Sequence, residues 1–252
     1  MWKALFGGSR AVDIDDAAWA AVLARSTLFG QLHPTVRDRL RERVGEFLAR
    51  KSFSAAGEHS LDDSQCLAIA AMACLPVVEL GIDSMDGWSE IIVYPDAFRV
   101  RREDHDEESG VVTEGEDELI GEAWERGPVI LSWADVEADL DHPFDGCNVV
   151  IHEIAHKLDM LDGAMNGVPR LPPWIDRKRW VETMQLAYDE LVKQVDDDRE
   201  TVIDPYAAES VEEFFAVVSE THFSTPRLLT QQHAALAQLL GDFYGKPVRE
   251  TG

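Results

Sequence analysis

The sequence predicts an α+β protein with N-terminal helices, a small and mostly antiparallel sheet, a central helix and C-terminal helices. Three observations support this fold class. Apolar residues recur at helical spacing over residues 12–51, and a nearly continuous apolar stretch covers 66–80. Two short runs rich in β-branched residues, at 90–94 and 129–133, have the length and composition of strands.

The N-terminal part of the chain has the pattern of consecutive helices. Asp15 precedes an Ala-rich stretch, and the helical pattern breaks before His33-Pro34, where a second helix is expected to begin. A third helix is expected over 66–80. Pro76 lies inside it and has no backbone N–H to donate, so it is expected to kink or end that helix.

An acidic segment separates the two strand candidates. The first strand should stop at Pro95, and the second should start after Gly127-Pro128. Residues 101–118 between them are dense in carboxylates, but their spacing does not match a calcium-binding EF-hand loop. We therefore interpret this segment as a solvated excursion from a hairpin formed by the two strands.

Composition and charge exclude several classes of protein. The 252 residues are 45% hydrophobic and 28% charged, as in globular domains that bury a core. With 23 Lys+Arg against 48 Asp+Glu, the net charge of −25 disfavours direct binding to nucleic acid or to anionic membranes. The sequence has no apolar run long enough to span a membrane and no signal-peptide pattern, so a cytoplasmic location is expected.

The motif that carries chemistry lies within residues 148–163. There His152, Glu153 and His156 form an H-E-x-x-H sequence. Residues four apart on a helix project from one face, so the two imidazoles can bind one metal ion. Zinc suits imidazole nitrogen and activates a bound water. Glu153 lies about 100° further round the helix, where it can accept a proton from that water.

Two histidines need a third protein ligand. A further histidine six residues after His156 would complete the metzincin pattern, but position 162 is Asp, so that pattern fails. The helix expected over 207–223 supplies the other common ligand, a glutamate. Its carboxylates are Glu209, Glu212, Glu213 and Glu220. Geometry favours Glu213, which flanks the apolar stripe, whereas helix periodicity does not exclude Glu212.

Several segments resemble one known family. His152–Met160 and Asp204–Glu220 are similar to the Mlc titration factor A family of bacterial zinc peptidases, also described as glucose-regulated peptidases. Four further segments fit the same family, so the resemblance covers about residues 25–245: Cys74–Gly81, Ile92–Pro95, Gly127–Trp133 and Phe223–Pro226. That family is itself similar to the catalytic core of anthrax lethal factor, a gluzincin-type metallopeptidase.

The resemblance implies a fold and a site. It implies a single zincin-like metallopeptidase domain over 1–252, in which about 1–85 is a helical N-terminal part and about 86–245 is the catalytic core. It also implies one Zn²⁺ per chain, bound by His152, His156 and the glutamate seven residues after the family's tyrosine. That tyrosine falls on Tyr206, so the glutamate is Glu213. The phenol of Tyr206 would stabilise the oxyanion, and Glu153 would activate the zinc-bound water.

The function implied by the resemblance is that of a cytoplasmic, aminopeptidase-like enzyme acting on peptides. The family also binds the Mlc transcription repressor, which controls the sugar phosphotransferase system. An aminopeptidase needs a carboxylate for the substrate's α-ammonium, and Glu209, Glu212 and Glu220 are candidates by proximity alone. The alternative is a regulatory binding protein that sequesters a repressor and hydrolyses weakly. The intact Glu153 and Tyr206 argue against a purely vestigial site.

Three residues near the motif have other interpretations. Asp159, one turn beyond His156, either orients a ligand imidazole or caps a local turn. His222 lies on the apolar stripe of the third-ligand helix and is interpreted as a satisfied core histidine. Cys147 precedes the motif and is interpreted as a packing residue, because the ligand set is complete without it.

Overall fold

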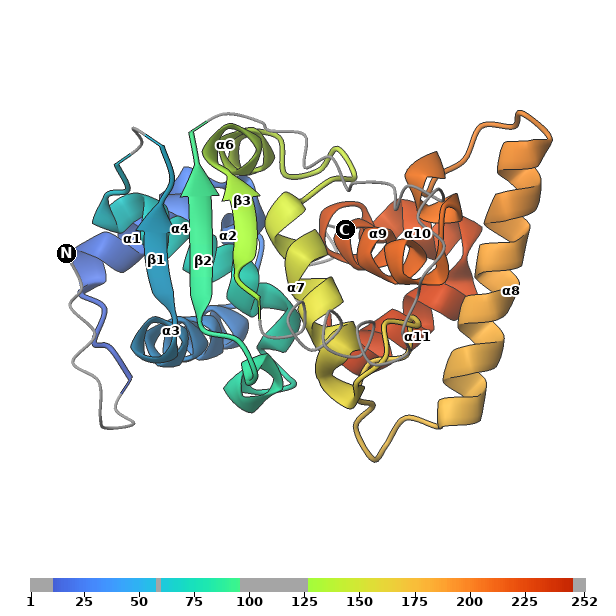
Figure 1. Cartoon of the computed structure of the whole chain (residues 1–252), viewed down its shortest axis with the longest axis horizontal. Coiled ribbons are helices and arrows are strands. Elements are labelled where there is room, and N and C mark those ends of the chain that lie inside the picture. The colour runs from blue at the N-terminus through green and yellow to red at the C-terminus, as the bar shows by residue number, and fades with distance from the viewer. Residues whose placement is uncertain (1–10, 58–59, 96–126, 247–252) are drawn as a thin grey trace, which may run out of the picture.

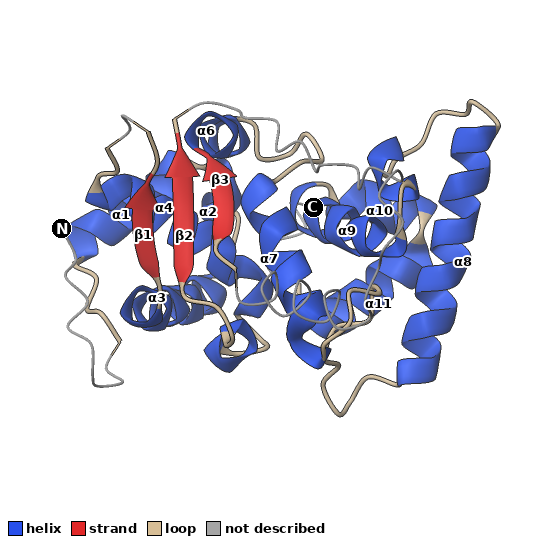
Figure 2. Ribbon diagram, viewed as in Figure 1, coloured by secondary structure: helices blue, strands red, loops and turns tan. Residues whose placement is uncertain are grey.

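The computed structural model describes residues 11–57, 60–95 and 127–246. Figures 1 and 2 show a small sheet at one end of the molecule, the long helix α8 at the other end, and α7 between them. The N-terminal elements are α1 (Asp16–Arg25), α2 (Thr27–Gly30), α3 (Pro34–Arg50), β1 (Ser52–Ala55), α4 (Asp63–Cys74) and β2 (Glu90–Tyr94). The C-terminal elements are β3 (Val129–Ser132), α6 (Trp133–Asp141), α7 (Val149–Asp159), α8 (Arg177–Asp196), α9 (Val211–Ser224), α10 (Pro226–Gln232) and α11 (Ala234–Tyr244).

The N-terminal helices agree with the prediction. His33 caps α3 through its ring nitrogen, and Pro34 takes the first helical position, where its missing N–H costs nothing. The apolar stretch that follows forms α4, in which every residue from Leu67 to Cys74 is buried. A 3₁₀ turn containing Pro76 follows directly, so the α-helix ends just before the proline, as expected.

The sheet is parallel among the described strands, so the prediction of a mostly antiparallel sheet was wrong. Its order is β1-β2-β3, and both neighbouring pairs run parallel. The connections 56–89 and 95–128 are long enough for crossovers, which parallel strands require and a hairpin does not. The short edge strand β1 was missed, because Ser52-Phe53-Ser54-Ala55 has no run of β-branched residues.

Two further expectations concern the acidic segment and membrane spans. The acidic stretch 101–118 lies outside the described residues, and the hairpin proposed to carry it is replaced by the parallel pair β2 and β3. Among the described helices, none combines the length and the apolar character needed to cross a membrane.

The helices α7 and α9 form the centre of the molecule. Asn148 caps α7 by accepting the N–H of Ile151, and the helix runs into a 3₁₀ turn that ends at Gly163, whose φ of +90° stops it. The helix predicted over 207–223 is divided in two. Residues Pro205–Ala208 form a 3₁₀ turn, and α9 begins only after Ser210, whose hydroxyl accepts the N–H of Glu213.

The loop after α7 passes very close to α9, and Gly167 is required there. Its φ is +71°, and a Cβ added to it would lie 2.9 Å from the carbonyl oxygen of Val211. Gly167→Ala is therefore expected to lower the free energy of unfolding by about 2–4 kcal/mol, from backbone strain and the forced shift of α9. Gly57 has a similar φ of +66° with open space around it, so Gly57→Ala should cost only about 1 kcal/mol.

Chemical denaturation of both variants measures this difference. Equal losses for the two glycines would show that the close approach to Val211 has no energetic consequence.

Candidate metal centre

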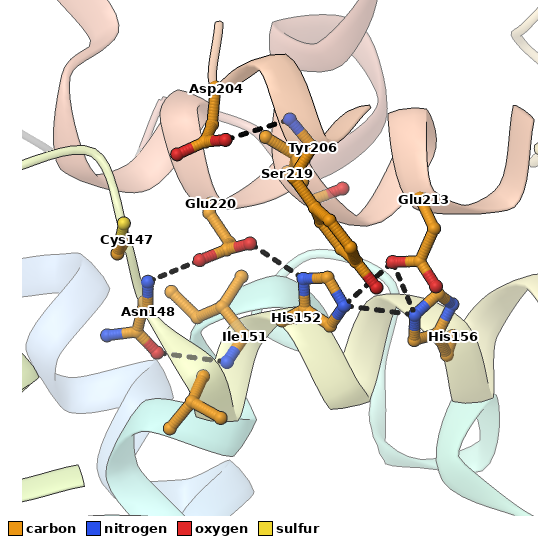
Figure 3. Close-up of polar contacts among 12 residues, drawn as sticks. Cys147, Asn148, Ile151, His152, His156, Asp204, Tyr206, Glu213, Ser219 and Glu220 are labelled. Carbon is orange, nitrogen blue, oxygen red and sulfur yellow. Dashed lines mark hydrogen bonds and ion pairs between the residues drawn. The ribbon is translucent and has the colours of Figure 1, made fainter. Parts of the chain in front are cut away.

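Three side chains from two helices converge between α7 and α9. His152 and His156 project from α7, and Glu213 projects from the first turn of α9 (Figure 3). The ligand atoms of these residues lie within 4.8 Å of one another. Glu213 Oε2 is 3.2 Å from His152 Nε2 and 3.5 Å from His156 Nε2, and the two Nε2 atoms are 3.1 Å apart. Within the described part of the chain, this is the one group of at least three such residues that could hold a metal ion.

Two of these three residues, Glu213 and His156, are deeply buried. Glu213 is only 1% exposed and His156 only 5%. Carboxylates are almost never buried this deeply without a charged or polar partner, because desolvation of the charge is costly. The two imidazoles beside Glu213 are the partners that the geometry gives it.

A second carboxylate from α9 lies behind His152. Glu220 Oε1 is 2.7 Å from His152 Nδ1, and Glu220 Oε2 accepts the backbone N–H of Asn148 at 2.5 Å. Glu220 and Glu213 are seven residues apart, about two helical turns, so both face α7. His152 therefore lies between two acidic side chains, one on each side of its ring.

This environment favours positive charge at the site. Burial by itself lowers the pKa of His152, but its hydrogen bonds to Glu213 and Glu220 outweigh burial and raise the pKa to about 10. The charge of Glu153 acts in the same direction. Carboxylates that stabilise a proton on this ring also stabilise a cation placed between the two histidines and Glu213.

The predicted catalytic residues lie next to this group. The ring centre of Tyr206 is 6.3 Å from that of His152, and its side chain points toward Glu213 and the histidines in Figure 3. Tyr206 is 40% exposed, and Asp204 accepts its backbone N–H at 2.9 Å. The side chain of Glu153, the residue after His152 on α7, is half-buried. Glu212, the rival third ligand, does not belong to the converging group.

The structure bears differently on the three neighbouring residues. His222 lies 3.0 Å from the carbonyl oxygen of Gly245, and burial lowers its pKa to about 4, as for a core histidine. Asp159 accepts the N–H of Gly167 at 2.8 Å, as a turn cap does, and it also interacts electrostatically with His156. Cys147 is exposed, so its interpretation as a packing residue was wrong. Partial desolvation and nearby carboxylates raise the pKa of its thiol to about 11, which disfavours the thiolate that a metal would need.

A further carboxylate, Asp139 of α6, accepts the backbone N–H of Val149 at the start of α7, at 2.7 Å. Burial raises the pKa of Asp139 to about 7, and the charges of Glu220, Asp145 and Asp135 add to this shift. Between about pH 4 and pH 7, Asp139 therefore keeps its proton in the native protein but has lost it in the unfolded chain. As a result, the contribution of Asp139 to stability falls as the pH rises from about 4 to about 7.

Asp139→Asn removes this charge but keeps an oxygen that can accept the Val149 N–H. Between pH 4 and pH 8, the stability of the variant relative to wild type is expected to increase by on the order of 2–4 kcal/mol. Denaturant unfolding of both proteins across this range measures the difference. Parallel pH profiles would contradict the raised pKa.

The residues present fit a divalent metal such as zinc. Two imidazole nitrogens and one carboxylate oxygen, all of them buried or half-buried, are a common set of protein ligands at catalytic zinc sites. Sequence reasoning found this set: helix periodicity left Glu212 as a rival, and the family resemblance implied Glu213. It missed the contact of Glu220 with His152, for which the sequence holds one signal, the seven-residue spacing from Glu213.

Comparison with known proteins identifies the family. The profile of the glucose-regulated metallo-peptidase M90 family matches residues 8–245. An uncharacterized protein from Synechocystis sp. is 42% identical over 229 residues, covering 90% of this chain and 82% of that protein. Mlc titration factor A from Escherichia fergusonii is 35% identical, and the match covers 92% of this chain and 87% of that protein. Mlc titration factor A from Klebsiella pneumoniae is 36% identical, and the match covers 93% of this chain and 89% of that protein. The resemblance to the Mlc titration factor A family is thus confirmed, and the chain belongs to the glucose-regulated metallo-peptidase M90 family.

Proposed function

We propose that this protein is a zinc-dependent, aminopeptidase-like peptidase of the gluzincin type, acting in the cytoplasm as a single zincin-like domain. The observation that carries the proposal is the convergence of His152, His156 and Glu213 within 4.8 Å, with Glu153 next to one of these residues in the chain. In this proposal, the two histidines and Glu213 are the three protein ligands of one Zn²⁺. Membership of a metallopeptidase family supports it.

A bound zinc ion would polarise the scissile carbonyl and lower the pKa of the attacking water. Glu153 takes a proton from that water as its oxygen bonds to the carbonyl carbon. The carbonyl oxygen then carries negative charge, and the phenol of Tyr206 donates a hydrogen bond to it. As the C–N bond breaks, Glu153 returns the proton to the leaving nitrogen. The partly exposed position of Tyr206 suits a residue that meets substrate.

The substrate's α-ammonium is left without an assigned partner. Of the three candidate carboxylates, Glu220 is engaged by His152 and by the backbone of Asn148, so it is a poor choice. Glu209 and Glu212 stay candidates by proximity alone.

The test is the metal content of the purified wild-type protein, together with hydrolysis of a panel of aminoacyl-nitroanilides and short peptides. One zinc per chain is expected. Removing it with a chelator should abolish hydrolysis, and restoring it should bring hydrolysis back. Protein without any divalent metal, or hydrolysis that survives complete removal of the metal, would contradict the proposal.

We propose a second function, binding of an Mlc-like transcription repressor, because several relatives carry the name Mlc titration factor A. A pull-down of purified repressor by this protein tests it directly. Zinc binding without hydrolysis of any panel member would favour the alternative, a regulatory binding protein with weak hydrolysis.

A further inference from the structure

We propose that Glu220 is a positioning residue, whose carboxylate sets the tautomer and the ring orientation of His152. The inference rests on the proposed metal centre and deepens it. It gives a role to a buried acidic side chain that takes no part in the proton transfers proposed above.

The contacts of Glu220 link three parts of the site. Glu220 is 7% exposed and lies on α9, on the same face as Glu213. One oxygen is 2.7 Å from His152 Nδ1, and the other accepts the backbone N–H of Asn148, the residue that caps α7. Figure 3 shows the Glu220 side chain reaching both partners from the α9 side. Glu220 thus ties the start of α7 to the His152 ring.

The chemistry of these partners determines where the proton of His152 lies. The N–H of Asn148 can only donate, so the Glu220 oxygen that it contacts accepts. An ionised carboxylate only accepts, so His152 Nδ1 must carry a proton and donate it. In the neutral ring, Nε2 then keeps its lone pair. That same Nε2 lies 3.2 Å from Glu213 Oε2, where a metal would bind.

The second histidine is held differently. His156 Nδ1 is buried and makes no hydrogen bond within the described part of the protein. Of the two imidazoles, only that of His152 therefore has a side-chain hydrogen-bond partner at Nδ1, the ring nitrogen that points away from Glu213, within the described part of the protein. We expect the loss of Glu220 to act on His152 in particular.

A carboxylate is specifically required at this position. Two donors, the Asn148 N–H and the His152 Nδ1–H, meet the two oxygens of Glu220. Glutamine offers only one oxygen and one NH₂ group. If its oxygen accepts from Asn148, its NH₂ faces His152 Nδ1 and favours the tautomer with the proton on Nε2, the wrong nitrogen for a metal. If the amide of the glutamine is turned the other way, its NH₂ faces the Asn148 N–H, and two donors then oppose each other.

The experiment measures zinc affinity by titration against a competing chelator, for wild type, Glu220→Gln and Asp145→Asn. We expect about 10- to 100-fold weaker zinc binding by Glu220→Gln. Asp145→Asn removes the same charge from the same neighbourhood, but Asp145 contacts the backbone N–H of Cys147. It should bind zinc as the wild type does, and thermal unfolding checks that both variants are folded.

A second measurement needs no variant. In zinc-loaded wild type labelled with ¹⁵N-histidine, long-range ¹H–¹⁵N spectra should show His152 protonated at Nδ1 and bound to metal through Nε2. A metal bound through Nδ1, or equal zinc affinities of wild type and folded Glu220→Gln, would overturn this inference and leave the proposed function in place. A wild-type protein that binds no zinc would overturn the proposed function, and this inference with it.

Discussion

Replacing Glu153 by Gln is expected to lower kcat for peptide hydrolysis by about 10²–10⁴-fold, while the protein keeps its zinc. The glutamine side chain has nearly the same shape as that of Glu153, but its amide cannot accept a proton from the attacking water. Glu153 does not belong to the group of ligand atoms that converge within 4.8 Å, so metal binding should not depend on it. Steady-state hydrolysis and elemental analysis of the same preparation measure both effects.

The matched control is Glu182→Gln, because Glu182 is an exposed carboxylate on α8 with no proposed role at the site. Its kcat should stay close to that of the wild type. Full activity of Glu153→Gln would mean that another group acts as the base, and loss of zinc would mean that Glu153 supports the metal site. The same variant should still bind an Mlc-like repressor. Loss of repressor binding by the folded variant would show that the two proposed functions are not separable.

Replacing Glu213 by Ala is expected to remove zinc from the purified protein and to abolish hydrolysis with it. The apparent zinc affinity should fall by more than about 100-fold, since losing a residue that only orients a ligand already costs about 10- to 100-fold. Glu213 is 1% exposed and lies 3.2 Å and 3.5 Å from the two histidine Nε2 atoms. Elemental analysis and a nitroanilide assay measure the two losses together.

The neighbouring carboxylate provides the control for this experiment. Glu212→Ala removes the adjacent side chain, which is half-buried and lies outside the converging group, and it should retain zinc. Glu213→Gln keeps the size of the buried side chain and serves if the Ala variant does not fold. Zinc retained by a folded Glu213 variant and lost from Glu212→Ala would show that the third ligand is Glu212.

Local sequence features predicted the parts of the fold that depend on a few neighbouring residues. His33-Pro34 begins α3 and Pro76 follows the end of α4, both as expected, and Gly163 ends the turn after α7. Each of these effects arises from one residue's backbone, namely the fixed φ and missing N–H of proline or the freedom of glycine to adopt positive φ. Such effects act wherever the residue lies in the tertiary structure.

The direction of the strands could not be predicted in the same way. The runs at 90–94 and 129–133 have strand composition whether they pair in parallel or not. The choice depends on the path of the connecting chain, and a long connection allows either arrangement. Composition suggested an acidic excursion from a hairpin, whereas the sheet has parallel neighbours.

The sequence by itself determined that His152 and His156 face one point, because residues four apart on a helix share a face. It also narrowed the third ligand to carboxylates of one later helix. Helix periodicity left Glu212 open, and the tertiary structure brings Glu213, the residue that the family resemblance implied, to those histidines; it alone placed Glu220 behind His152. The physical reason is that these contacts span more than fifty residues of chain, and the packing of α9 against α7 decides which face of α9 is turned toward the histidines.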